Sequence, residues 1–183
     1  MLPLERHMDM LLRVVPDAKR IGTVYNPGEA NAVALVKMLE ETLEKRGLTL
    51  EKAAATKTSE VLGAARSLSG KVDAIYLTTD NTVISAAEAV ISVGERANIP
   101  LFAADTATVE RGAVAAMGFD YYDLGRQTGA MVVRILEGAA PADIPVESVD
   151  QLELFVNPGA AKKMGISLDD DPISEASKVI GSE

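Results

Sequence analysis

The sequence contains no cysteine, a single histidine and few aromatic residues, which make up 4% of its 183 residues. Without cysteine, the chain forms no disulfide, has no cysteine-ligated metal and carries no thiol nucleophile. The one histidine, His7, falls in a stretch with helical apolar spacing, and we expect it at the surface. A Ser–His–Asp triad or a histidine-ligated zinc is therefore not expected. We predict no metal, no cofactor and no enzymatic activity.

Phosphate-binding motifs and long apolar runs are also missing. Neither G-x-x-x-x-G-K-[ST] nor a G-x-G-x-x-G after a predicted strand is present, so the common nucleotide-binding fingerprints are absent. No stretch approaches the roughly 20 apolar residues of a membrane-spanning helix. Residues 1–7 lack the basic start and apolar run of a signal peptide. The net charge of −9 disfavours nucleic acid and anionic membranes, which bind clustered Lys and Arg.

What the sequence does contain is an alternation of short apolar runs with amphipathic segments, in a composition with 48% apolar and 25% charged residues. Strands are predicted at Arg20–Tyr25, Leu48–Ala54, Val72–Leu77, Pro100–Ala104 and Ala113–Phe119. Helices are predicted at Leu4–Val15, Asn31–Arg46, Thr58–Leu68, Thr82–Asn98 and Tyr121–Glu137, with a short turn of helix ending at Arg111. The alternation predicts an α/β fold, a doubly wound, mainly parallel five-stranded sheet with helices on both faces.

The segment after Gly138 breaks this alternation and is predicted to be a C-terminal extension that packs elsewhere. Val146–Val156 has the pattern of an edge strand, and Gly159–Met164 and Ile173–Ile180 have the pattern of short closing helices.

Small polar residues follow three of the predicted strands. Asn26 and Asn31 follow the first, Thr79, Asp80 and Asn81 follow the third, and Asp105 follows the fourth. Each could merely cap a helix or close a turn. Since the carboxyl ends of parallel strands share one edge, where such sheets bind ligands, their coincidence favours a binding site there.

The chemistry of this edge suits a small zwitterion such as an amino acid. Helix N-termini present free N–H groups to a carboxylate. Asp80, Asp105 and Asp120 bring negative charge, which suits an ammonium group. The aromatic residues near this edge either line the pocket or belong to the core; they are Tyr25, Phe119, Tyr121 and Tyr122.

Several stretches of the chain resemble one family. They are residues 25–31 (YNPGEAN), 78–83 (TTDNTV), 102–106 (FAADT), 111–129 (RGAVAAMGFDYYDLGRQTG), 144–147 (IPVE) and 152–157 (LELFVN). The family is that of the ABC-transporter substrate-binding proteins of the tryptophan/tyrosine-uptake type, which have the periplasmic-binding-protein type I fold. The resemblance extends from Met1 to about Ile180.

The resemblance implies a non-catalytic solute-binding component of an ABC importer that binds an amino acid or a similar small molecule. It also implies a location outside the cytoplasm, in the periplasm or on a lipid anchor. Its partners would be the small-molecule ligand and an ABC permease, with no nucleic acid. The ligand-binding residues that it implies are Asn26, Asn31, Thr79, Asp80, Asn81 and Asp105, with Asp120 near the hinge.

The resemblance also implies a division of the chain. Residues 1–117 correspond to the second, ligand-binding lobe, residues 118–138 to a helix that returns to the first lobe, and residues 139–183 to a closing strand and short terminal helices. The chain is thus expected to be a partial, C-terminal portion that binds ligand weakly or not at all. We expect the apolar face of the Tyr121–Glu137 helix either to form a homodimer or to fold back onto the domain.

Two other classes remain open from the residues alone. A ligand-sensing regulatory domain is one, because effector domains of bacterial repressors share the fold, although no basic helix-turn-helix segment is present. An enzyme with a flavodoxin-like or Rossmann-like sheet is the other, and the lack of a catalytic His or Cys and of a phosphate loop disfavours it.

Overall fold

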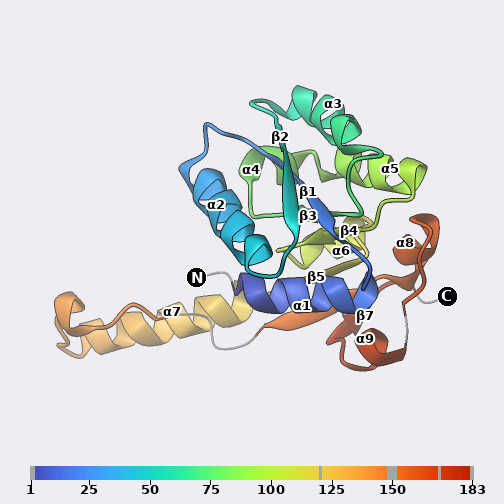
Figure 1. Cartoon of the computed structure of the whole chain (residues 1–183). Helices are drawn as coiled ribbons and strands as arrows, with labels where there is room; N and C mark the ends of the chain where they lie inside the picture. The colour runs from blue at the N-terminus through green and yellow to red at the C-terminus, as the bar shows by residue number, and fades with distance from the viewer. Residues whose placement is uncertain (1–2, 120, 148–151, 169, 182–183) are drawn as a thin grey trace.

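The structure is a computed structural model that describes residues 3–119, 121–147, 152–168 and 170–181. Its sheet has the strand order β2-β1-β3-β4-β5-β6-β7 (Figure 1). The strands are β1 Arg20–Tyr25, β2 Thr49–Ala54, β3 Ala74–Leu77, β4 Leu101–Ala103, β5 Ala115–Gly118, β6 Glu153–Val156 and β7 Lys178–Val179. The first five are mutually parallel, which confirms the predicted α/β class; β6 runs antiparallel to β5, and β7 parallel to β6.

Helices cover both faces of this sheet. They are α1 Leu4–Val14, α2 Ala30–Glu44, α3 Thr58–Leu68, α4 Asn81–Ser85, α5 Ala87–Ala97, α6 Ala107–Arg111, α7 Tyr121–Leu136, α8 Pro158–Lys163 and α9 Asp170–Ser174, with a 3-10 turn at Pro141–Asp143. Helices α1 and α2 pack against each other on one side of the sheet, and α3 and α5 pack against each other on the other side (Figure 1).

The pleat of the central strands explains these two layers. A Cβ on Gly22 of β1 would lie 3.1 Å from Leu68 of α3. Ile75 of β3 is the register partner of Gly22, so the next residue, Tyr76, points to the opposite face, where it meets α1. All four residues of β3 are buried, because this strand lies between β1 and β4 with helices above and below.

His7 is buried, and the expectation of a surface histidine is wrong. Its side chain has no exposed area, and its Nδ1 lies 2.7 Å from the hydroxyl oxygen of Tyr76. Burial, together with the charge of Arg6, lowers the pKa of His7 to about 4. The local helical pattern could not reveal this position, because Tyr76 is 69 residues away in sequence.

The predicted Thr82–Asn98 helix consists of two helices, α4 and α5. The break is at Ala86, which has φ −121° and ψ 28°. Arg111 of α6 donates a 2.7 Å hydrogen bond from Nη1 to the carbonyl oxygen of Ile84. A long-range partner thus takes a carbonyl that a continuous helix would use internally, and the helix restarts at Ala87.

The C-terminal segment differs most from the prediction, because it joins the main sheet. Strand β6 covers only Glu153–Val156 and lies between β5 and β7, so it is not an edge strand. Val146 is fully exposed, and residues 148–151 lie outside the described residues. The predicted Ile173–Ile180 helix ends at Ser174 and is followed by β7. Strands β6 and β7 together make the sheet two strands wider than the five predicted.

Helix α7 projects away from the sheet and from the other helices (Figure 1). None of its residues is buried, so it does not fold back onto the domain. Its outer turns expose large apolar side chains, including Val132, Val133, Ile135 and Leu136. Among the described residues, no helix combines the length and the apolar character needed to cross a membrane.

Candidate functional site

A cavity of about 200 Å³ opens where β3 and β4 end. It brings together four of the residues that the sequence predicts for the site, Thr79, Asp80, Asn81 and Asp105, and its other lining residues are Ile84, Ser85 and Tyr121. Asn26 and Asn31 do not line it. Asp120 lies outside the described residues.

Asp80 is built into the frame of this cavity. Its side chain is 1% exposed, and each carboxylate oxygen accepts a backbone hydrogen bond. Oδ2 accepts from the N–H of Asn26 at 2.6 Å, and Oδ1 accepts from the N–H of Val83 at 2.9 Å. One carboxylate therefore caps α4 and fixes the end of β1 to the end of β3.

Asn26 and Asn31 shape the loop after β1. The Oδ1 of Asn26 accepts a hydrogen bond from the N–H of Gly28 at 2.8 Å, and its Nδ2 donates to the hydroxyl of Thr82 at 2.9 Å. The Nδ2 of Asn31 donates to the carbonyl oxygen of Thr79 at 3.0 Å. Both amides hold the loop after β1 against the residues that follow β3, and these residues form a wall of the cavity.

Glu29 completes this frame, and sequence reasoning missed it. Its carboxylate accepts from the N–H and the side-chain Nδ2 of Asn81 at 3.0 and 2.8 Å. It also accepts from the N–H and the hydroxyl of Thr82 at 3.0 and 2.6 Å. These bonds, led by that of the Thr82 hydroxyl, lower the pKa of Glu29 to about 2. The partners are 52 and 53 residues away, so no local motif signals the role.

These carboxylates change what the helix N-termini offer to a ligand. The first three N–H groups of α4 donate to Glu29 and Asp80, so the expectation that this helix presents free N–H groups is wrong. Asp105 likewise accepts from the N–H of Ala107 at 3.0 Å and from the hydroxyl of Thr108, at the start of α6. Helix α2 differs, since it begins at Ala30 without a side-chain cap.

Half-buried Asp105 is the carboxylate that stays accessible at the cavity. Tyr121 is 67% exposed, and its ring packs edge-to-face on Phe119 with 5.0 Å between centroids. Of the other aromatic candidates, Tyr25 is half-buried at the end of β1 and Tyr122 is exposed. The cavity thus has one aromatic wall, made by Tyr121.

Behind the cavity, Arg111 holds α6 against α4 and α5. Its Nε and Nη2 donate to the two carboxylate oxygens of Glu88, each at 2.7 Å. This bidentate pair lowers the pKa of Glu88 to about 2. Within the described part of the chain, no three His, Asp or Glu side chains gather as metal ligands would.

Comparison with known proteins decides the family. The model of the ABC transporter substrate binding protein family matches residues 1–180. The chain belongs to this family. The family predicted from the sequence stretches is therefore confirmed, and the regulatory alternative is not favoured.

Individual relatives match nearly the whole chain. A curated tyrosine-binding protein of Clostridioides difficile is 32% identical over 163 residues, 89% of this chain and 47% of the relative. A conserved domain protein from Vibrio cholerae is 40% identical with a TM-score of 0.91, covering 98% of this chain and 60% of the other. An ABC domain from Streptococcus pneumoniae, solved in complex with L-Trp, is 34% identical with a TM-score of 0.87, covering 97% and 60%.

More distant solved structures show the fold alone. Sugar-binding proteins and LacI family regulators, 10% to 15% identical, match with TM-scores of 0.59 to 0.66. This confirms a fold like that of the type I periplasmic binding proteins. The chain spans about half the length of the curated relatives it matches.

Proposed function

We propose that this chain forms one ligand-binding lobe of an ABC importer's substrate-binding protein, and that its ligand is an amino acid. The observation that carries the proposal is the cavity at the ends of β3 and β4, where polar side chains and Asp105 meet beside Tyr121. The C. difficile tyrosine-binding protein and the S. pneumoniae domain with L-Trp support an aromatic amino acid as its ligand.

In this proposal the ammonium group of the ligand pairs with Asp105. The carboxylate of Asp80 is buried with both oxygens bonded to backbone N–H groups, so it supports the wall instead. The ligand carboxylate turns toward the uncapped start of α2, whose Asn31 is already anchored on Thr79. The aromatic side chain of the ligand packs on Tyr121.

The size of the cavity fits half of a two-lobed cleft. Its volume of about 200 Å³ is below the roughly 300–1,000 Å³ of sites that enclose a whole ligand. We infer that, in a two-lobed protein of this family, the second half of the cleft comes from the part of the longer relatives that this chain does not match. Closure of the two lobes would then present the liganded form to a permease, outside the cytoplasm.

We also propose that, in this chain, α7 pairs with α7 of a second copy. The support is its length of 16 residues without a buried side chain, together with apolar side chains that follow a helical spacing, including Leu124, Met131 and Ile135. Water-exposed apolar surface of this kind favours association.

Titration calorimetry with a panel of amino acids tests the binding proposal. We expect L-tryptophan or L-tyrosine to bind saturably, and Asp105→Asn to weaken binding at least tenfold, about 1.4 kcal/mol, because it removes the charge facing the ammonium group. The Oδ1 of asparagine still accepts the hydrogen bond from the N–H of Ala107, so the fold is kept.

The matched control is Asp17→Asn, at an exposed position before β1, at the opposite end of the strand from the cavity. Its affinity should equal that of the unchanged chain. Equal binding by Asp105→Asn, or no saturable heat with any amino acid, would overturn the proposal.

A further inference from the structure

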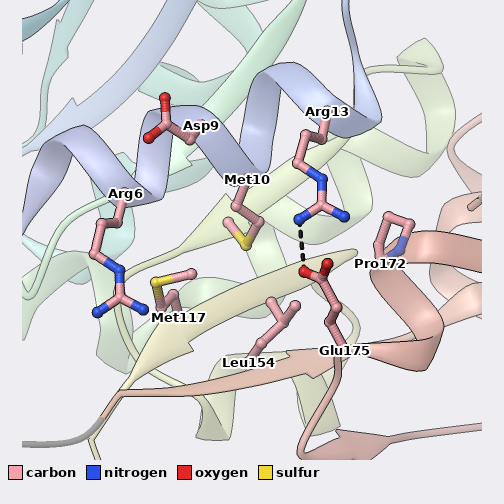
Figure 2. Close-up of a pocket in the computed structure, with 8 residues that line it drawn as sticks. All are labelled: Arg6, Asp9, Met10, Arg13, Met117, Leu154, Pro172 and Glu175. Atoms are coloured by element: carbon pink, nitrogen blue, oxygen red, sulfur yellow. Dashed lines mark hydrogen bonds and ion pairs between the residues drawn. The ribbon is translucent and has the colours of Figure 1, made fainter.

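A second cavity of about 200 Å³ lies between α1, the β5–β6 pair and α9 (Figure 2). Its main lining residues are Arg6, Met10, Arg13, Met117, Leu154 and Glu175. None of them lines the cavity at the ends of β3 and β4. The two cavities are therefore separate, and the proposed amino-acid site leaves this one unexplained.

The floor of the second cavity is apolar. Met10 of α1, Met117 of β5 and Leu154 of β6 turn their side chains toward the same space (Figure 2). Met117 and Leu154 are register partners in adjacent strands, so they lie side by side on one face of the sheet. Two flexible thioethers and one leucine make a surface that adapts to a short hydrocarbon chain.

Its charged groups leave one cation without a partner. Glu175 pairs with Arg13 at 2.6 Å, and this pair closes one end of the cavity (Figure 2). Asp9, which also borders the cavity, pairs with Arg46 at 2.7 Å. Among the described residues, the guanidinium of Arg6 has neither an ion pair nor a side-chain hydrogen bond. A positive group therefore stands at the open end of an apolar floor, on a chain with a net charge of −9.

We propose that this second cavity binds a small organic monocarboxylate with an apolar chain. The carboxylate pairs with the guanidinium of Arg6, which can bind both oxygens at once, and the chain lies over Met10, Met117 and Leu154. A free amino acid fits less well, because both carboxylates that could receive its ammonium group, Asp9 and Glu175, are already paired with arginines. The volume is too small for a drug-sized molecule.

Methyl NMR of the full chain with ¹³C-labelled methionine tests the proposal with hexanoate as the probe. We expect saturable shifts of the Met10 and Met117 methyl signals with a Kd on the order of 1 mM, a usual affinity for a ligand of this size. The methyls of Met38 and Met131, in α2 and α7, should not move. Hexan-1-ol, which lacks the charge, and acetate, which lacks the chain, should each bind at least fivefold more weakly.

The decisive variant is Arg6→Gln, and the matched control is Arg66→Gln, an exposed arginine on α3 across the sheet. Arg6→Gln should weaken hexanoate at least fivefold, to the affinity of hexan-1-ol, and Arg66→Gln should change it less than twofold. The proposal is overturned if hexanoate leaves the Met10 and Met117 signals unchanged, if hexan-1-ol binds equally well, or if Arg6→Gln binds as the unchanged chain does.

The result is independent of the amino-acid site. L-tryptophan at the ends of β3 and β4 should leave the Met10 and Met117 signals in place, whether or not hexanoate shifts them. Failure of one proposal is thus distinguishable from failure of the other.

Discussion

Asp80 and Glu29 organise the strand ends by using their oxygens inside the protein. Between them they accept the first three N–H groups of α4 and the N–H of Asn26. Two carboxylates that hold loops from β1 and β3 together give the cavity a fixed wall before any ligand arrives. Preorganisation of this kind lowers the ordering that a ligand must bring about.

Replacement of Glu29 tests this frame. Glu29→Gln keeps the shape but loses acceptor strength and one acceptor oxygen, so we expect a loss of about 1–2 kcal/mol in the free energy of unfolding at pH 7. Chemical denaturation measures it. Glu44→Gln, at an exposed position in the last turn of α2, is the control and should change stability by less than about 0.5 kcal/mol.

The difference in the free energy of unfolding between Glu29→Gln and the unchanged chain should also depend on pH. Because the pKa of Glu29 is about 2 in the folded state, its contribution is complete above its ordinary pKa near 4.5 and disappears as the pH falls to about 2. An unchanged stability of Glu29→Gln at neutral pH would contradict the role assigned to Glu29.

Buried His7 predicts a second pH effect, with a different window. Its pKa is about 4 when folded and about 6.5 when unfolded, so between these values the unfolded chain binds the extra proton. Stability should therefore fall by about 3 kcal/mol as the pH drops from about 6.5 to 4.

The comparison is with His7→Gln, whose amide can face Tyr76 but does not titrate. Above about pH 7, the free energies of unfolding of the two chains should differ by a constant amount. As the pH drops toward 4, the free energy of unfolding of the unchanged chain should fall by about 3 kcal/mol more than that of His7→Gln. A drop of equal size in His7→Gln over this range would show that other groups cause it.

At the residue scale, the sequence predicted which side chains lie close together better than it predicted their roles. Thr79, Asp80, Asn81 and Asp105 do meet at one cavity, because strand ends of a parallel sheet share an edge. That Asp80 is buried could not be predicted, since its partner Asn26 is 54 residues away. The involvement of Glu29 likewise depends on contacts that only the fold creates.

At the scale of elements, close packing of α5 depends on Gly94. A Cβ added there would lie 2.7 Å from the carbonyl oxygen of Ile99 and 3.3 Å from the Cε of Met164, which is the residue after α8. We expect Gly94→Ala to lose about 1–3 kcal/mol in the free energy of unfolding, because backbone must move to make room.

Gly63 of α3 is the matched control. An added Cβ would meet nothing within 4 Å there, so Gly63→Ala should gain about 0.5–1 kcal/mol from helix propensity alone. Thermal unfolding of both variants checks the pair. A Gly94→Ala protein as stable as Gly63→Ala would mean that α5 can shift away from the turn that follows it.

The elements that sequence predicted well are those with strong local patterns. The central strands are apolar runs bounded by polar turns, and α2, α3 and α7 have clear amphipathic spacing, so each was placed within a few residues. The division between α4 and α5 depends on Arg111, and β7 is a two-residue strand recognised only by its pairing with β6. Neither leaves a periodic signal in the sequence.

At the scale of the whole molecule, the exposed α7 predicts self-association. Sedimentation equilibrium should show a concentration-dependent dimer, and Ile135→Lys should weaken it at least tenfold by placing a charge in the apolar face. Val146→Lys is the control, because Val146 is fully exposed but lies outside α7. A monomer at all concentrations, or a dimer that Ile135→Lys leaves unchanged, would contradict this prediction.

The molecule as a whole combines a rigid sheet with a cavity at one edge and a projecting helix. The family match extends over nearly the full chain, while the relatives are longer than the chain itself. Under the proposed function, the amino-acid site lies at the ends of β3 and β4, and its affinity in this chain should be weaker than that of a closed two-lobed cleft.

The most direct measurement is a titration of the uniformly ¹⁵N-labelled chain with L-tryptophan, followed by amide NMR shifts. We predict saturable shifts concentrated at Thr79, Asn81, Asp105 and the start of α2, with the amides of α9 and β7 unchanged. Shifts concentrated elsewhere, or none up to the solubility of the ligand, would contradict an amino-acid site at this edge of the sheet.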